Sequence, residues 1–381
     1  MKDIKEINLV ITHLCNLNCI YCYEVNKDKG EMSIELARNI LSKYLSTVSC
    51  DELAINFFGG EPLLRFPFVK ELCQWTWEHE WPQRYIFYVD TNGVNLSDEI
   101  KEWASFNNKR IIFLLSLDGS PKTQNLNRSN SFDLIDIDFF INNWPDQGVK
   151  MTISDKHLED LADDIIYLHS RGLKIKGANI AEGIVISDFE RKLTIIKEQY
   201  AKLIDWYVAH PTIEVAQIFD LDLSLCESHK QERIKYCGCG SNSIKVIDID
   251  GKEYPCTYFF PLSMNQSELN KINKYDLSND NLFINEDCLQ KCYIFPICKG
   301  CYGDNYSTTG KFSTRSIQRC RLSKLRALSV ATLKAKRILL EMHASLSEEE
   351  KDTIIAIQNI YKLFGDTEKP KAEKEVEANI F

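Results

Sequence analysis

The sequence INLVITHLCNLNCIYCYE occupies residues 7–24 and determines how the rest of the chain is interpreted. Its first six residues are rich in apolar and β-branched side chains and predict a β-strand. Three cysteines follow within eight residues, at Cys15, Cys19 and Cys22. We therefore expect three thiolates on a loop at the carboxyl end of a strand, where barrel enzymes build their active sites.

Five further stretches of the same kind follow, separated by amphipathic segments of helical length. Alternating strands and helices indicate parallel strands joined by right-handed crossovers. We expect an α/β fold, a partial (β/α)6 TIM-like barrel over residues 1–215, with a doubly wound sheet as the alternative. The predicted strands are INLVIT (7–12), LAINFF (53–58), YIFYV (85–89), IIFLLSL (111–117), VKMTI (149–153) and LKIKGANI (173–180).

Local signals mark helix ends, and the pattern of long strands and helices changes to short elements and cysteines after the predicted barrel. Ser33 is expected to cap one helix and Gly172 to end another. The segment SIKVIDIDGKEYPC (243–256) predicts a hairpin that turns at Asp250-Gly251. Beyond it we expect a small cysteine-rich domain over 216–325, helices over 326–365 and a disordered tail over 366–381. The pair Ser347 and Glu350 forms a capping box for the last helix, which is expected to end near Gly365.

The bulk composition excludes several classes of partner. The chain has 381 residues and a formal net charge of -9, which disfavours nucleic acid and anionic membranes. Neither a long apolar run nor a signal peptide is recognised, so the protein is expected to be cytoplasmic. The cytosol keeps thiols reduced, so the 14 cysteines predict metal binding in preference to disulfides.

The spacing Cys15-x3-Cys19-x2-Cys22 favours an iron-sulfur cluster. Three thiolates hold three irons of a 4Fe-4S cube and leave the fourth iron open to a ligand. A zinc site is the alternative, but zinc sites usually show paired Cys-x2-Cys units. His13, two residues earlier, is expected to pack near the loop or to support a ligand.

The stretch ITHLCNLNCIYCYE resembles the cluster loop of the radical S-adenosylmethionine superfamily, including the aromatic Tyr21 before the third cysteine. The resemblance implies that Cys15, Cys19 and Cys22 hold a 4Fe-4S cluster and are catalytic. It also implies that the open iron binds S-adenosylmethionine and that one electron cleaves it to methionine and a 5'-deoxyadenosyl radical. That radical abstracts a hydrogen atom from the substrate.

Elements at the ends of three later strands resemble the contacts that this superfamily makes to S-adenosylmethionine. Glu61 is implied to receive the amino group, and Arg128 has the spacing of a carboxylate-pairing arginine. Each element also has an ordinary interpretation as a turn. The implied cofactor residues are Tyr21, Gly59, Gly60, Glu61, Asn92, Ser116, Asp118 and Arg128, with Asp90 nearby.

The second cysteine region resembles the SPASM extension of peptide-modifying radical enzymes, which holds auxiliary 4Fe-4S clusters. The four cysteines from Cys288 to Cys301 are spaced by three, five and two residues, whereas the family commonly shows two, five and three. Two zinc knuckles are the alternative. The resemblance implies a near cluster on Cys237 or Cys239, Cys256 and Cys301, with Cys226 as an extra ligand, and a far cluster on Cys288, Cys292, Cys298 and Cys320.

The residue after Cys256 bears on the substrate. Sulfatase-activating relatives carry an aspartate there as a base, but this chain has Thr257. We therefore expect a maturase that cross-links a ribosomally made precursor peptide, with a carbon-carbon cyclophane favoured over a thioether or ether. The expected electron donor is a flavodoxin or ferredoxin. Formylglycine formation, peptide epimerisation and a non-catalytic zinc-binding peptide scaffold are the alternatives.

Overall fold

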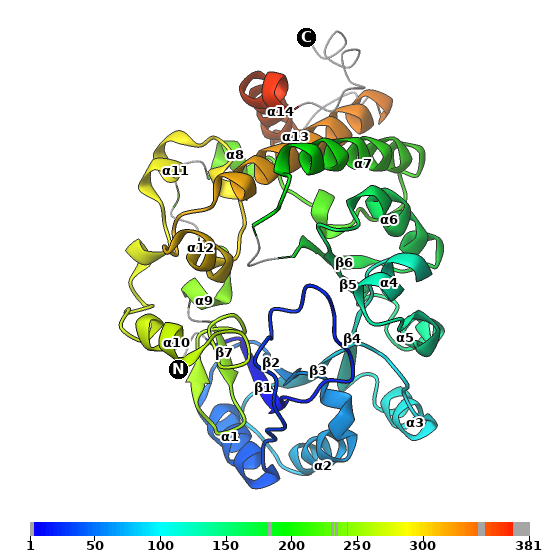
Figure 1. Cartoon of the computed structure of the whole chain (residues 1–381), viewed down its shortest axis with the longest axis vertical. Helices are drawn as coiled ribbons and strands as arrows, with labels where there is room; N and C mark the ends of the chain where they lie inside the picture. The colour runs from blue at the N-terminus through cyan, green and yellow to red at the C-terminus, as the bar shows by residue number, and fades with distance from the viewer. Residues whose placement is uncertain are drawn as a thin grey trace. The chain divides into compact units, whose positions relative to one another are not determined.

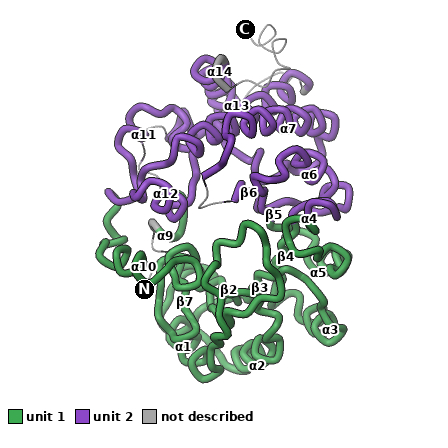
Figure 2. The backbone as a smooth tube through the Cα atoms, viewed as in Figure 1, with its two compact units in different colours: residues 1–117, 124–150, 236–280 green, residues 118–123, 151–235, 281–381 purple. Residues whose placement is uncertain are grey.

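The computed structural model describes residues 4–181, 185–229, 232, 235–241, 243–341 and 347–368. Figure 1 shows strands and helices alternating along most of this chain, as the sequence predicts. The chain divides into two compact units, coloured separately in Figure 2. Unit 1 comprises residues 1–117, 124–150 and 236–280, and unit 2 comprises residues 118–123, 151–235 and 281–381.

Unit 1 is built on a mainly parallel sheet with the strand order β4-β3-β2-β1-β7-β8. At its β4 edge the sheet also pairs with Val149 and Lys150, the first residues of β5. The predicted strands are confirmed, and β7 and β8 form the predicted hairpin, with Gly251 at a left-handed φ of 81°. The bounds are Glu6–Thr12 for β1, Leu53–Gly59 for β2, Tyr85–Thr91 for β3, Ile111–Ser116 for β4, Val149–Ile153 for β5, Ile244–Ile247 for β7 and Glu253–Tyr254 for β8.

The hairpin joins the sheet in a way that its local sequence does not indicate. Strand β7 pairs in parallel with β1, from Glu6 opposite Ile244 to Leu9 opposite Ile247. Only β8, the returning strand, is antiparallel. The strand that leads into the cysteine loop therefore lies between β2 and β7.

The register of the parallel strands separates an apolar face from a partly polar one. Leu9 lies opposite Phe57, and Phe57 lies opposite Val89, all fully buried. On the alternate face Asn8 lies opposite Asn56. Since successive side chains of a strand point to opposite faces, one face forms the hydrophobic core and the other carries polar groups.

Helices of unit 1 follow the strands and begin at recognisable caps. The hydroxyl of Ser33 accepts a hydrogen bond from Leu36 N at 3.2 Å, as expected of an N-cap. The helix after it, α1, buries Ala37, Leu41 and Leu45. The bounds are Ile34–Thr47 for α1, Phe66–Trp77 for α2, Asp98–Phe106 for α3, Pro121–Asn127 for α4, Ile137–Asn143 for α5, Gly238–Ser241 for α9 and Gln266–Ile272 for α10, with short 3-10 turns at Pro62–Arg65 and Phe132–Leu134. Of these, α4 lies across the division between the units.

Unit 2 is mainly helical and contains the long helices near the carboxyl end. The predicted helix after Cys320 is confirmed as α13, which runs along α7 (Figure 1), where Arg337 donates to Tyr207 O at 3.0 Å. The bounds are Ile175–Ile180 for β6, which pairs with the rest of β5, Leu161–Ser170 for α6, Phe189–Ala209 for α7, Leu225–Ser228 for α8, Glu286–Lys291 for α11, Tyr302–Thr309 for α12, Ile317–Glu341 for α13 and Glu348–Glu368 for α14, with 3-10 turns at Leu158–Asp160, Gln217–Phe219, Asp280–Leu282 and Phe295–Ile297.

The last helix confirms the predicted capping box. Ser347 N donates to the Glu350 carboxylate at 2.7 Å, and Glu350 N donates to the Ser347 hydroxyl at 3.2 Å. The expected end near Gly365 is wrong, because α14 continues to Glu368. The remainder of the predicted tail, 369–381, lies outside the described residues, and the three predicted domain boundaries stay predictions.

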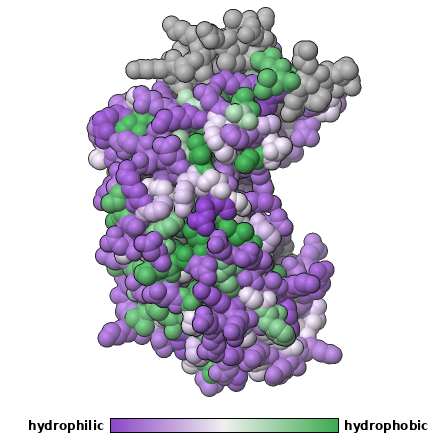
Figure 3. Space-filling view, turned by 90° about the vertical axis from the view of Figure 1, so that its right-hand side faces the viewer, coloured by the Kyte–Doolittle hydropathy of each residue, from purple (hydrophilic) through white to green (hydrophobic). Residues whose placement is uncertain are grey.

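Among the described helices none is both long and apolar enough to cross a membrane. The face in Figure 3 is mostly hydrophilic, with hydrophobic side chains gathered in small groups.

Candidate active site

Two glycines at the end of β2 hold the start of the cysteine loop by close backbone contact. Gly60 N donates to Thr12 O at 3.0 Å, and Glu61 N donates to Leu14 O at 2.7 Å. A Cβ atom on Gly59 would lie 2.0 Å from Thr12 O, and one on Gly60 would lie 2.1 Å from Leu14 O. Gly59 also has a φ of 131°, a backbone angle that residues with a side chain rarely adopt. The Gly-Gly sequence is therefore required by the approach of β2 to the cysteine loop.

The middle of the cysteine loop is held by the last residue of α4 and by the residue that follows it. Ile20 N donates to Asn127 O at 3.0 Å. The Arg128 guanidinium lies over the Tyr21 ring, 5.4 Å from its centroid, within the range of a cation-π contact. Tyr21 and Arg128, both predicted to serve the cofactor, are thus brought into contact.

Glu61 is buried and accepts three hydrogen bonds from its own fold. Its carboxylate receives Leu63 N at 3.1 Å, the Thr91 hydroxyl at 2.9 Å and Asn92 N at 2.8 Å. Burial raises the pKa of Glu61 to about 7, although these donors oppose the shift. The Asn92 side chain in turn donates to Asn16 Oδ1, on the cysteine loop, at 2.8 Å. The structure therefore joins Glu61 and Asn92 to the loop that carries the cysteines.

The three thiols of the loop are half-buried and have a cation beside them. Lys27 Nζ lies 3.3 Å from Cys22 Sγ. Burial alone would lower the pKa of Lys27, but the thiolates of Cys22 and Cys15 raise it by more. Burial raises the pKa of Cys15, and Lys27 opposes that shift. Lys27 was not predicted as a site residue, since nothing in the segment VNKDKGE distinguishes it from Lys29.

His13 links the cysteine loop to the β7–β8 hairpin. Its Nδ1 lies 2.7 Å from Asp28 Oδ1, and its Nε2 lies 2.8 Å from Asp248 Oδ1. Burial lowers the pKa of His13, but the two carboxylates outweigh it and the net shift is upward. A histidine between two carboxylates is stabilised as a cation that donates from both nitrogens.

The residue after Cys256 lies against the cysteine loop. The Tyr23 hydroxyl donates to Thr257 Oγ1 at 3.4 Å. The rings of Tyr23 and Tyr258 stack with centroids 5.9 Å apart and planes 20° apart. Phe260 and Leu262, a few residues later, are fully buried against Val10 and Val246 on the alternate face of the sheet. This packing fixes the segment beside the loop.

The polar face of the sheet carries a connected row of side chains. Asn56 Nδ2 lies 2.9 Å from Asn8 Oδ1 and 2.6 Å from Asp90 Oδ2. Asp90 also forms an ion pair with Lys150. Ser116 lies opposite Lys150 in the register of β4 and β5, which places it at the end of this row. Lys150 is the member of the row that the sequence analysis did not single out.

Asp118 belongs to unit 2, whereas the other predicted cofactor residues belong to unit 1. It is fully buried, and its Oδ1 accepts from Thr152 N at 3.0 Å. The hydrogen bond joins the segment after β4 to β5. This contact gives Asp118 a structural role whatever its relation to a cofactor.

The cysteines predicted for a near cluster are divided between the units. Cys237, Cys239 and Cys256 belong to unit 1, and Cys301 belongs to unit 2. Cys239 is buried, and the other three are half-buried. This ligand set stays a prediction.

The cysteines predicted for a far cluster lie together in unit 2. Burial, together with the neighbouring Cys298, Cys288 and Cys320, raises the pKa of Cys292 to about 11. Burial also raises the pKa of Cys226 to about 12, with Glu227 and Cys292 next in effect. Cys226 thus lies near Cys292, and its predicted role as an extra ligand of the near cluster stays a prediction.

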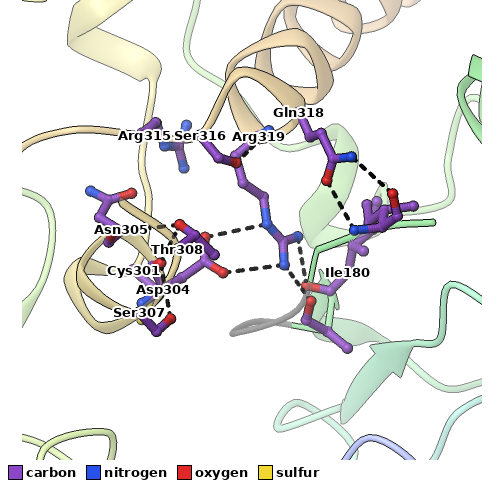
Figure 4. Close-up of polar contacts among 12 residues, drawn as sticks. Ile180, Cys301, Asp304, Asn305, Ser307, Thr308, Arg315, Ser316, Gln318 and Arg319 are labelled. Carbon is purple, nitrogen blue, oxygen red and sulfur yellow. Dashed lines mark hydrogen bonds and ion pairs between the residues drawn. The ribbon is translucent and has the colours of Figure 1, made fainter. Parts of the chain in front are cut away.

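A buried ion pair supports two helices, α12, which Cys301 caps, and α13, which contains Cys320 (Figure 4). Asp304 N donates to Cys301 Sγ at 3.4 Å, and the Asp304 carboxylate lies 3.2 Å from Arg319 Nε. Arg319 also donates to Ile180 O at 3.3 Å and to Ala181 O, at the end of β6. Both charged side chains are at least nine-tenths buried. The pair therefore fixes the start of α12 and α13 against the end of a strand.

Comparison with known proteins identifies the first part of the chain. Residues 7–133 match the family model described as a 4Fe-4S single cluster domain. The radical SAM cyclopropyl synthase TigE of Paramaledivibacter caminithermalis is 29% identical over 127 residues, which cover 29% of this chain and 27% of that protein. Residues 7–133 are thus similar to a 4Fe-4S cluster domain and to a radical S-adenosylmethionine enzyme.

Two known structures extend the likeness over most of the chain. The structure of anSMEcpe with bound AdoMet has a TM-score of 0.64 at 19% identity, over 93% of this chain and 100% of the other. SuiB of Streptococcus suis, bound to its precursor peptide SuiA, has a TM-score of 0.56 at 18% identity, over 84% and 76%. At such identities the likeness shows the fold alone, and it confirms the predicted fold class.

The matched family model describes a 4Fe-4S cluster, and the similar structure of anSMEcpe binds AdoMet. Among the residues that the structure describes, no three His, Cys, Asp or Glu side chains are grouped to hold a single metal ion. In a cube the thiolates bind different irons, so they need not meet around one point. Three half-buried thiols on one loop, with Lys27 beside them, fit such a cube.

Proposed function

We propose that this enzyme modifies a residue of a ribosomally made precursor peptide and forms an intrapeptide cross-link. A carbon-carbon cyclophane is the favoured product, with a thioether or ether as variants. The observation that carries the proposal is the contact of Tyr23 with Thr257, which puts the residue after Cys256 beside the cysteine loop. A reaction at this loop would meet a threonine where formylglycine formation needs a carboxylate.

We assign cluster binding to Cys15, Cys19 and Cys22. The bound cluster supplies the electron that cleaves S-adenosylmethionine and so starts the radical reaction. Glu61 is assigned to the amino group of S-adenosylmethionine. A carboxylate offers about four lone-pair positions, and three are used within the fold, which leaves one for this ammonium. Hydrogen bonds from Thr91 and Asn92 fix the orientation of that remaining position.

The other assigned cofactor contacts lie around the same loop. Arg128, held over Tyr21, would pair with the carboxylate of S-adenosylmethionine, because guanidinium and carboxylate match in shape. Asn92 and Ser116 would contact its methionine or ribose part. Asn92 is supported by its hydrogen bond to Asn16 on the loop. Ser116 is supported by its place on the polar face of the sheet.

The absence of a carboxylate at position 257 separates cross-linking from formylglycine formation. A threonine hydroxyl does not ionise near neutral pH, so it is a poor proton acceptor. Its oxygen already accepts from the Tyr23 hydroxyl. Thr257 therefore suits a positioning contact better than general-base catalysis.

A pair of aromatic side chains beside the loop supports an aromatic substrate residue. Tyr23 is 38% exposed and stacks on Tyr258. Aromatic contacts of this kind contribute about 0.5–1.5 kcal/mol beyond burial. A peptide aromatic ring that joined this stack would lie next to Cys22 and Thr257, as a cyclophane-forming reaction requires.

Cross-linking also needs an acceptor for one electron. The 5'-deoxyadenosyl radical removes one hydrogen atom, and closing the new bond releases a proton and an electron. We assign the electron to auxiliary clusters on the second set of cysteines, and we assign the first reduction to a flavodoxin or ferredoxin in the cytoplasm. The grouping of Cys292 with Cys288, Cys298 and Cys320 supports at least one such cluster.

The alternatives are epimerisation, formylglycine formation and a zinc-binding peptide scaffold. The scaffold is disfavoured because residues 7–133 match a 4Fe-4S cluster domain. The formylglycine alternative is disfavoured by Thr257. Epimerisation would need a hydrogen donor on the opposite side of the peptide α-carbon.

Anaerobic co-expression with a short precursor encoded beside the gene tests the proposal by mass spectrometry of the peptide. A cross-link is expected to remove two hydrogens from the precursor, with the new bond located by fragmentation. The variant carrying alanine at Cys15, Cys19 and Cys22 serves as the control and should leave the precursor unchanged. An unchanged mass with deuterium uptake from heavy water would identify an epimerase, and turnover of a sulfatase peptide alone would overturn the proposal.

A further inference from the structure

Arg315 makes a direct contact with one cysteine of the far group. Its Nη1 lies 2.9 Å from Cys298 Sγ and 2.5 Å from Ser323 Oγ, and its Nη2 donates to Lys299 O at 2.7 Å. Three acceptors thus hold the guanidinium in one orientation. Arg315 precedes α13, the helix that carries Cys320, so the contact joins two segments of the far group.

The main chain leaves space for this guanidinium at Gly300. A Cβ atom at that position would lie 2.0 Å from Arg315 Nη2 and 2.6 Å from its Cζ. The φ angle of Gly300 is not in the left-handed region, so its backbone does not itself require glycine. Because Gly300 has no side chain, the Arg315 guanidinium can lie against Cys298 Sγ.

A cation that contacts a cluster thiolate favours the reduced cluster, which carries one more negative charge. Hydrogen bonds to the ligand sulfur act in the same direction. We propose that Arg315 is a positioning residue that raises the reduction potential of an auxiliary cluster by holding its guanidinium on Cys298. The inference rests on the auxiliary clusters of the proposed function. A raised reduction potential makes the cluster on the far group a better electron acceptor.

The charge on Arg315 can be separated from its position by two kinds of variant. Arg315→Gln removes the charge and the contact. Gly300→Ala keeps the charge but moves the flexible end of Arg315 away from the sulfur. Arg321→Gln is the matched control, because it removes an arginine next to Cys320 that instead pairs with Glu190 at 3.1 Å.

The experiment is a redox titration followed by electron paramagnetic resonance on anaerobically reconstituted protein. All variants are made in the background that carries alanine at Cys15, Cys19 and Cys22, so that only auxiliary clusters contribute. We expect Arg315→Gln to lower the equilibrium constant for one-electron reduction about tenfold, which corresponds to about 59 mV. Gly300→Ala should shift it in the same direction by a smaller factor. Arg321→Gln should leave it unchanged.

Equal potentials in the background protein, Arg315→Gln and Gly300→Ala would overturn the inference. A shift in Arg321→Gln as large as that in Arg315→Gln would also overturn it, because net charge alone would then explain the effect. If Arg315→Gln does not retain the cluster, Gly300→Ala decides. A background protein without iron would overturn the auxiliary clusters themselves, and this outcome is distinguished by iron analysis before any titration.

Discussion

Nε2 of His13 lies 2.8 Å from Oδ1 of Asp248, although 235 residues separate them in the chain. Both side chains are only 5% exposed. The contact fastens the cysteine loop to a hairpin that joins the same sheet much later in the sequence. The loop is therefore stabilised by long-range contacts as well as by its own turns.

Asp248→Ala should destabilise the protein strongly, because it removes the buried one of the two carboxylates that pair with His13. Breaking a buried ion pair costs about 3–5 kcal/mol. Asp250→Ala is the matched control, since Asp250 lies two residues away and pairs with Lys252 at the surface, where such pairs contribute about 0–1 kcal/mol. Urea unfolding of the metal-free proteins measures both changes. Equal effects of the two substitutions would show that His13 and Asp248 do not stabilise the loop.

Glu61→Gln should weaken S-adenosylmethionine binding without removing iron. The lost charge-assisted hydrogen bond to the ammonium contributes about 1.5–3 kcal/mol, or roughly ten- to a hundredfold in affinity. The amide would also present N–H to one of the three donors that now bind the carboxylate, so some loss of stability is expected. Equilibrium binding to the reconstituted enzyme provides the measurement.

Thr91→Val separates these two effects. It removes one internal hydrogen bond to Glu61 but leaves the carboxylate in place. The variant should lose stability and retain most of its affinity for S-adenosylmethionine. If Glu61→Gln binds the cofactor as tightly as the parent, Glu61 only closes a turn.

Lys27→Met should lower the reduction potential of the cluster on Cys15, Cys19 and Cys22, because it removes the cation 3.3 Å from Cys22 Sγ. Lys27 is half-buried, so an effect of about 1 kcal/mol is expected, roughly fivefold in the equilibrium constant for reduction. Lys29→Met is the control, since Lys29 is exposed in the same loop. Redox titration of both variants tests this. A shift shared by both would assign the effect to net charge.

His169 should make stability depend on pH below neutrality. It is buried, its Nδ1 lies 3.2 Å from Leu173 O and its Nε2 lies 2.9 Å from the Tyr207 hydroxyl. Burial lowers its pKa in the folded protein, against a weaker opposite effect of the Leu173 carbonyl. The unfolded chain therefore takes up a proton first, and this stabilising contribution is lost as the pH falls below about 6.5.

The difference in unfolding free energy between the parent and His169→Gln should shrink as the pH falls from 7.5 to 5. His210→Gln, at an exposed site, serves as the control for a histidine lost without burial. Urea unfolding across this range gives the comparison. A difference that stays constant with pH would contradict the assignment of a neutral, buried His169.

Local signals in the sequence predicted the elements well because they depend on neighbouring residues. Strand β1 was predicted from an apolar run. The caps at Ser33 and Ser347 could be predicted because their hydrogen bonds join residues only three positions apart. The Gly59-Gly60 pair was identified as functional, but the reason for both glycines became clear only from the backbone of Thr12 and Leu14.

Long-range pairing could not be predicted in the same way. The parallel pairing of β7 with β1 joins segments that are more than 200 residues apart, and no local pattern of the hairpin specifies it. The same holds for Arg315 on Cys298 and for Cys226 beside Cys292. Lys27 was missed because its neighbours are equally polar and only the fold selects it.

The most direct test of the account is the release of 5'-deoxyadenosine from S-adenosylmethionine under dithionite. The reconstituted parent should release it, and the variant with alanine at Cys15, Cys19 and Cys22 should release none while it keeps the iron of its auxiliary clusters. Release at the parent's rate by this variant would contradict the assignment of the radical-forming cluster to these three cysteines.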